Sequence, residues 1–195
     1  MSWSDIPAVL RAFDNKPGAR VSEPLTVQLL WSLLLYVPSL APSLGLPRNA
    51  TWYNGGRGVA DLQARSDDRT ILAQVEVKSN KAAWNWSVHC ENNCGVVDGQ
   101  SQLLHFVEHD GPIVVVTQSR RVPLVCADIE DLELGARVTV LSFDDLARKV
   151  AKALKRSGEP DTLLLACLYD VEEVVAAAPR ASGASSAPDA QPAKR

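Results

Sequence analysis

Two adjacent segments with alternating apolar and polar residues constrain the fold of this chain more than any other feature. Within residues 59–65 the even positions are apolar and the odd positions from 61 on are polar. Within residues 70–78 the odd positions from 71 on are apolar, and positions 74, 76 and 78 are polar. A period of two is typical of strands that bury one face, and the intervening Ser66-Asp67-Asp68-Arg69 is typical of a turn. The pattern predicts a hairpin with one core face and one polar face.

The alternation also restricts how the two strands pair. A two-residue turn at Asp67-Asp68 places Asp61 opposite Gln74, with Glu76 diagonal to Asp61 on the same face. A shift of one residue would turn Asp61 into the core, so the hydrophobic pattern disfavours it. The sequence therefore predicts that Asp61, Glu76 and Lys78 lie together on one side of a sheet.

These three side chains have a chemistry in common. Two carboxylates held close together repel each other unless a divalent cation lies between them. Oxygen ligands favour Mg²⁺ or Mn²⁺ over zinc. A lysine beside such a site can orient or deprotonate a water molecule, or neutralise charge on a phosphoryl oxygen, which suits phosphodiester hydrolysis. The alternative is that Asp61, Glu76 and Lys78 are ordinary solvated residues on the outer face of the sheet.

The rest of the chain predicts helices and further strands around the hairpin. Apolar spacing and capping residues predict helices over residues 5–14, 23–36, 100–109, 143–155 and 159–178. Short β-branched or apolar runs predict strands at 51–54, 113–117, 122–127 and 138–141. Three prolines between residues 37 and 47 predict a loop.

The order of these elements resembles the PD-(D/E)xK nuclease superfamily over roughly residues 22–117. The resemblance implies an α/β fold with a restriction-endonuclease-like αβββαβ core, in which helices flank a central mixed sheet. It implies that Asp61 and Glu76 are metal ligands and that Lys78 is the catalytic lysine. It further implies that the backbone carbonyl of Val77 contributes to the metal.

Relatives in this superfamily often add two further site residues. An acidic residue in the first helix is one of them, and Glu23 takes that place as a metal ligand. A glutamine in the helix after the hairpin is the other, and Gln102 fits it within the segment 102–106, where Phe106 replaces the tyrosine of many relatives. Gln100 is an equally placed alternative. Ala60 stands where relatives often carry proline before the first ligand.

The resemblance implies a nuclease that depends on Mg²⁺ or Mn²⁺ and hydrolyses DNA in repair or recombination, restriction or phage defence. RNA stays open as the substrate. The alternative is a non-catalytic interaction module of the same fold within a nucleic-acid-processing complex. In that case the loop around Trp84 and Trp86 and the helix from residue 160 to 178 would dock a partner, as a homodimer or a larger assembly.

Residues for nucleic-acid contact follow the hairpin. Trp84 and Trp86 come shortly after Lys81 and could stack on unpaired bases or close the rim of the core. The residues expected to bind nucleic acid are Arg57, Lys81, Trp84, Trp86 and Gln100. The cations best placed to meet a phosphate backbone are Arg57, Arg65, Lys81, Arg120 and Arg121.

Composition sets the remaining bounds. The net charge of -3 argues weakly against a nucleic-acid-binding protein, although a total can hide a local basic patch. The four cysteines are too scattered for a disulfide scaffold, and His89, Cys90 and Cys94 as a zinc site are less favoured than free thiols. No leader is expected, because residues 1–15 are amphipathic and acidic and lack a basic segment followed by an apolar one. No membrane span is expected, because the apolar stretch at residues 29–40 is interrupted and short. We expect a cytoplasmic protein.

The domain organisation follows from these boundaries. A nuclease-like domain is expected over residues 1–157, followed by a C-terminal helix over 158–178. Residues 179–195 are rich in Ala, Ser, Pro and charged residues, and a segment of this composition is expected to be disordered.

Overall fold

The fold is taken from a computed structural model of the chain. It describes residues 2–15, 23–48, 50–55, 60–78, 109–131 and 135–160. The predicted helices at 100–109 and 159–178 and the predicted disordered tail lie outside the described residues, apart from a residue or two at their edges.

The described residues contain one mixed sheet of five strands in the order β1-β2-β3-β4-β5. The strands are β1 (Thr51–Asn54), β2 (Leu62–Arg65), β3 (Ile71–Val77), β4 (Ile113–Thr117) and β5 (Val138–Ser142). The first three form an antiparallel meander, while β4 pairs parallel with β3 and β5 pairs parallel with β4. The predicted α/β class with a central mixed sheet is confirmed.

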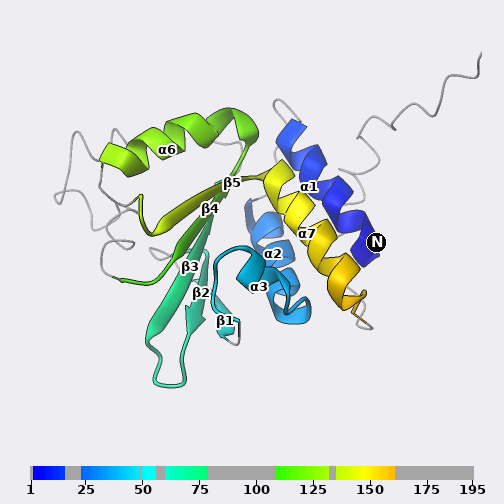
Figure 1. The fold of residues 1–195 in the computed structure, drawn as a ribbon, viewed down its shortest axis with the longest axis horizontal. Helices are drawn as coiled ribbons and strands as arrows, with labels where there is room; N and C mark the ends of the chain where they lie inside the picture. Colours follow the sequence, from blue (N-terminus) through cyan, green and yellow to red (C-terminus); the bar gives the residue numbers. More distant parts are fainter. Residues whose placement is uncertain are drawn as a thin grey trace, which may run out of the picture.

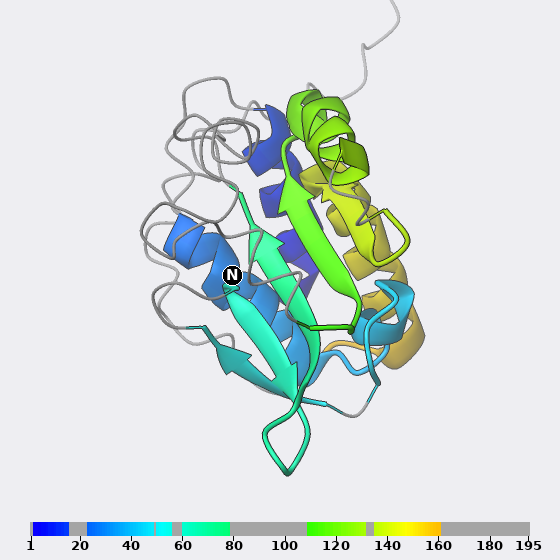
Figure 2. The ribbon, with the colours of Figure 1, turned by 90° about the vertical axis from the view of Figure 1, so that its left-hand side faces the viewer.

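Helices cover both faces of this sheet (Figures 1 and 2). They are α1 (Ile6–Asn15) after a 3-10 turn η1 (Trp3–Asp5), α2 (Glu23–Tyr36), α3 (Leu40–Ser43), η2 (Ser119–Arg121), α6 (Val122–Asp131) and α7 (Phe143–Ser157). The first three α-helices and α7 lie on one side, and α6 lies on the other. No helix in the described part is long and apolar enough to cross a membrane.

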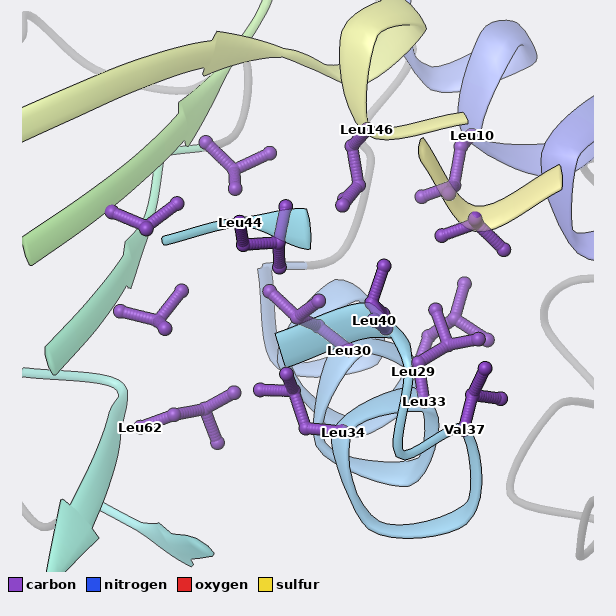
Figure 3. Packing of buried hydrophobic residues seen from close by; sticks show 14 of the residues in the cluster. Leu10, Leu29, Leu30, Leu33, Leu34, Val37, Leu40, Leu44, Leu62 and Leu146 are labelled. Atoms are coloured by element: carbon purple, nitrogen blue, oxygen red, sulfur yellow. The ribbon is translucent and has the colours of Figure 1, made fainter. Parts of the chain in front are cut away.

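The larger core lies on the side of α2. This helix is apolar around most of its circumference, and Figure 3 shows why: Leu30 and Leu34 face Leu62 of β2, while Leu29 and Leu33 lie on the opposite side of the helix. All of these side chains are buried. Each buried leucine contributes about 1.5–3 kcal/mol to stability through removal from water. This cluster therefore stabilises the three-stranded meander on the face that carries Leu62.

The apolar run of β4 divides between two cores. Val114 and Val116 join the larger core, whereas Val115 packs in a smaller cluster with Val125 and Ile129 of α6. Because successive side chains point to opposite faces, only a strand covered on both sides needs five consecutive apolar or β-branched residues. The predicted buried strand at residues 113–117 is confirmed.

Several predicted boundaries are also confirmed. The helix predicted over residues 23–36 has these bounds as α2. The predicted cap of the last core helix is present, since the backbone N–H of Asp145 donates a 2.9 Å hydrogen bond to Oγ of Ser142. The loop predicted between residues 37 and 47 was wrong in one part, because it contains the four-residue helix α3.

The strand predicted at 122–127 was wrong, since these residues form the first turns of α6. Pro123 lies in the first helical turn, where its missing N–H has no intrahelical partner to lose. Val125 and Ile129 are four residues apart and share the face that packs on the sheet. The short apolar run at 122–127 fits either structure, and the packing decides between them.

The hairpin register differs from the prediction by two residues. Leu62 pairs with Val75 and Gln63 pairs with Gln74, so the same register continued by one residue places Asp61 opposite Glu76. The predicted pairing of Asp61 with Gln74 was therefore wrong. The reason is a longer turn and an irregularity after Ala64. A shift of two residues leaves Asp61, Glu76 and Lys78 on their predicted shared face, because the side-chain period is two. Ala60 packs in the smaller cluster instead of beside Leu62, and Leu72 packs against the larger core.

The hairpin turn runs from Ser66 to Thr70 rather than over two residues. Oδ1 of Asp68 accepts a 3.1 Å hydrogen bond from the backbone N–H of Thr70, and the Ser66 hydroxyl also donates to this carboxylate. Arg69 adopts a left-handed conformation, with φ of 69°. A turn residue in this conformation followed by a bulge is a common way to close a longer hairpin.

Candidate active site

Two acidic side chains form the centre of the site: Glu76 near the end of β3 and Asp61 just before β2. Glu76 lies on β3 with 1% of its surface exposed, and Asp61 is half-buried directly across from it. Their positions are held by the backbone: the N–H of Asp61 donates a 3.2 Å hydrogen bond to Oε2 of Glu76, and the N–H of Val77 donates a 2.7 Å bond to Oδ2 of Asp61. The structure thus brings the two predicted carboxylates together.

Lys78 completes the predicted triplet. Its Nζ forms an ion pair with Oε1 of Glu76, and its side chain is half-buried at the end of β3. The backbone N–H of Lys78 donates a 2.8 Å hydrogen bond to the carbonyl of Val116, which continues the parallel pairing with β4. The ammonium is therefore held beside the carboxylates by its strand as well as by its charge.

The environment of this cluster disfavours the charged form of Glu76. Burial, and after it the charge of Asp61, raise the pKa of the Glu76 carboxyl to about 8, against the opposing effect of Lys78. A buried carboxylate beside a second carboxylate favours protonation unless further positive charge is supplied. The single ammonium of Lys78 compensates only part of this cost.

Unsatisfied polar atoms gather on the same face. Within the described residues, the buried side-chain atoms that accept or donate no hydrogen bond are Nε2 and Oε1 of Gln74, Oε1 of Glu76 and Oγ1 of Thr117. Oε1 of Glu76 still has Lys78 as its ion-pair partner. Buried polar groups in proteins are nearly all satisfied, so a cluster of exceptions indicates a place where a polar ligand or ordered water belongs.

A hydrated divalent cation fits this donor set. Mg²⁺ is commonly bound through one or two carboxylates and keeps several of its waters, which matches two carboxylates with unsatisfied polar groups nearby. In the described part of the chain, no group of three or more His, Cys, Asp or Glu side chains comes together. Glu23 is the first residue of α2, but its side chain is outside the described atoms, so this predicted ligand stays a prediction.

The other predicted site residues divide into two groups. The Val77 side chain is buried in the larger core, and its N–H holds Asp61; its carbonyl as a metal ligand stays a prediction. The predicted residues that lie outside the described part of the chain are Arg57, Lys81, Trp84, Trp86, His89, Cys90, Cys94, Gln100 and Gln102.

Three of the predicted phosphate-binding cations are described. Arg65 donates hydrogen bonds of 3.2 and 2.6 Å to Oε1 of Gln63, and its guanidinium carbon lies 5.7 Å from the ring centroid of Tyr53. Arg120 donates a 3.0 Å hydrogen bond to Oε1 of Gln118, and Arg121 follows it in η2 after β4. Only Arg65 lies on the same face of the meander as Asp61.

Sequence reasoning missed Gln74 and Thr117. The alternation of β3 placed Gln74 on the polar face opposite Asp61, but alternation does not indicate whether a polar-face residue is buried. Thr117 ends an apolar run and carries no signal of its own. Only the strand register shows that it lies beside Lys78.

Comparison with protein-family models, with curated proteins and with solved structures gave no match to this chain.

Proposed function

We propose that this chain is a metal-dependent nuclease that hydrolyses DNA phosphodiester bonds on a restriction-endonuclease-like core. The observation that carries the proposal is the opposed pair Asp61 and Glu76, with the ammonium of Lys78 on the Glu76 carboxylate. Two carboxylates and a lysine on one face can bind a divalent cation and stabilise charge on a phosphoryl group, which suits metal-assisted phosphodiester hydrolysis.

Asp61 and Glu76 would hold Mg²⁺ or Mn²⁺, with Glu23 and the Val77 carbonyl as the further ligands that the family resemblance implies. When bound, the cation supplies a Lewis acid for the phosphoryl oxygens and lowers the pKa of water. The raised pKa of Glu76 supports this assignment, because added positive charge would stabilise its carboxylate form.

The protein residues have separable tasks in this proposal. The ammonium of Lys78 is paired with the Glu76 carboxylate and its side chain is 13% exposed; in this proposal it orients the attacking water and neutralises charge on the phosphoryl group. Glu76 fixes the direction of the Lys78 side chain. The backbone N–H of Val77 donates a hydrogen bond to Oδ2 of Asp61 and so orients this carboxylate before substrate arrives.

The choice of substrate rests on the resemblance. The observed order α2, β1, β2, β3 and β4 is compatible with the αβββαβ core, of which the second helix would lie outside the described residues. RNA remains an alternative substrate for the same chemistry, since the site as described has no group that distinguishes the two sugars.

The test is cleavage by the purified full-length chain. Supercoiled DNA, linear DNA and RNA are incubated with Mg²⁺, Mn²⁺ or EDTA, and the products are separated on gels. We expect metal-dependent cleavage of DNA, lowered at least 100-fold by Glu76→Gln and by Lys78→Met. Lys152→Met is the matched control for Lys78, because Lys152 is exposed on α7.

Two outcomes would overturn the proposal. Cleavage that survives in both Glu76→Gln and Lys78→Met would assign the activity to another site or to a contaminant. Calorimetry that shows no binding of Mg²⁺ or Mn²⁺ to the wild-type chain would favour the non-catalytic interaction module instead.

A further inference from the structure

In the part of the chain that the structure describes, the buried side-chain atoms without hydrogen bonds lie on one face of β3 and β4. Gln74 and Glu76 alternate with core residues on β3, so their side chains share the face that carries Asp61. On β4, Thr117 is one residue beyond Val116, the partner of Val77, and therefore lies beside Lys78 on that face. Gln74 lies two residues before Glu76 on β3, and Thr117 of β4 lies beside Lys78, two residues after Glu76. Gln74 and Thr117 therefore lie on either side of the two carboxylates.

Burying these polar atoms without hydrogen bonds lowers the stability of the folded chain. Gln74 is 1% exposed and Thr117 is 0% exposed, and neither side chain has a partner within the described residues. A buried donor or acceptor that is left unsatisfied costs about 1–3 kcal/mol. An apolar side chain of the same size would avoid this cost at either position, so the polar atoms need an explanation.

Buried glutamine elsewhere in the described chain is satisfied. Gln118 is also 1% exposed, but its Nε2 donates a 3.2 Å hydrogen bond to the carbonyl of Phe13 and its Oε1 accepts from Arg120. Gln63 accepts two hydrogen bonds from Arg65. Gln63 pairs with Gln74 and shares its face, so the lack of partners is specific to Gln74 and Thr117 rather than general to buried glutamines in this fold.

We infer that Gln74 and Thr117 are positioning residues that hydrogen-bond the water molecules of a hydrated divalent cation held at Asp61 and Glu76. The inference rests on the proposed function and adds two residues to its site. A carboxamide both donates and accepts, and a hydroxyl does the same, so both groups suit water whose hydrogens and lone pairs are directed by an ion. Partners of this kind commonly contribute 10- to 100-fold to metal affinity.

The test separates metal binding from folding. Gln74→Met and Thr117→Val keep the side-chain volume close to the original and remove the polar atoms. The dissociation constant of Mn²⁺ is measured by titration calorimetry on the full chain, and the melting temperature is measured without metal. We expect each variant to bind Mn²⁺ at least 10-fold more weakly, with a metal-free melting temperature equal to or above that of the wild type.

Gln118→Met is the matched control. It removes a satisfied amide of equal burial, so it lowers the metal-free melting temperature and leaves the Mn²⁺ affinity unchanged. Wild-type affinity in both Gln74→Met and Thr117→Val would overturn the inference and leave the proposed nuclease intact. A wild-type chain that binds no Mn²⁺ would overturn both.

Discussion

Asp61 and Glu76 lie across from each other on the antiparallel β2–β3 pair, with the backbone N–H of Asp61 3.2 Å from Oε2 of Glu76. The next residue on β3 returns a backbone hydrogen bond of 2.7 Å to Oδ2 of Asp61. Each strand therefore fixes the carboxylate of the other. The backbone thus holds two carboxyl groups together, and burial of Glu76, followed by the charge of Asp61, raises the pKa of the Glu76 carboxyl.

The first prediction is a pH dependence of stability. The pKa of Glu76 rises from 4.5 to about 8 on folding, so between these values the folded chain binds a proton that the unfolded chain has released. The contribution of Glu76 to the free energy of unfolding is therefore fully present below about pH 4.5 and is lost as the pH rises through about 8. Urea unfolding of the metal-free protein across this range measures it.

Glu76→Gln is the control for this prediction. It keeps the shape of the side chain and removes its titration, so the part of the slope due to Glu76 should disappear. An unchanged slope in Glu76→Gln would assign the pH dependence to another group.

The second prediction concerns Gly55, which contacts the site only through its backbone. Its N–H donates a 2.6 Å hydrogen bond to the carbonyl of Asp61, and a Cβ at this position would lie 1.8 Å from the carbonyl oxygen of Ala60. Gly55→Ala must move the backbone that carries Asp61. We expect a loss of Mn²⁺ affinity and of about 1–3 kcal/mol of stability, measured by calorimetry and urea unfolding.

Gly135→Ala is the matched control, because nothing lies within 4 Å of a Cβ there. It should change neither Mn²⁺ affinity nor stability by more than about 0.5 kcal/mol. A Gly55→Ala variant that behaves like Gly135→Ala would show that the Ala60 carbonyl can move without displacing Asp61.

The third prediction is a phosphate contact at Arg65. Within the described residues the guanidinium has neutral partners, the Gln63 amide and the Tyr53 ring, which hold it in place without neutralising its charge. If the proposed substrate is correct, Arg65→Ala weakens DNA binding and lowers the dependence of log affinity on log salt by about 1. Fluorescence anisotropy at several salt concentrations without divalent metal measures both.

Arg148→Ala is the control, since Arg148 on α7 is paired with Asp144 and Asp145. Its removal should leave the salt dependence unchanged. Equal effects of Arg65→Ala and Arg148→Ala would show that the loss of one positive charge, rather than a phosphate contact at Arg65, causes the change.

The fourth prediction tests the hairpin turn. Arg69 has φ of 69°, a conformation that costs a non-glycine residue about 1–2 kcal/mol. Arg69→Gly removes this cost but adds freedom to the unfolded chain, so we expect a net gain of about 0.5–1 kcal/mol in urea unfolding. Arg69→Ala keeps the strain and should not gain. A glycine variant less stable than the alanine variant would contradict the assigned turn.

The register error shows where sequence reasoning about the site ended. Alternation along β2 and β3 determined which side chains share a face, and a shift of two residues left Asp61, Glu76 and Lys78 together. It did not determine which residues are opposite each other, because that depends on the length of the turn. The left-handed Arg69 and the hydrogen bonds of Asp68 set this length, and neither has a strong sequence signal.

The sequence by itself determined the mixed α/β class, the bounds of α2 and β4, and the shared face of the three polar residues, because these follow from local periodicity and caps. The tertiary structure alone decided that residues 122–131 form α6, since an apolar run fits a strand or a helix until it packs on β4. It alone decided that the face of Asp61 is buried at Glu76, Gln74 and Thr117. Burial of a polar residue is set by what the whole chain places above it, and residue spacing carries no information on that.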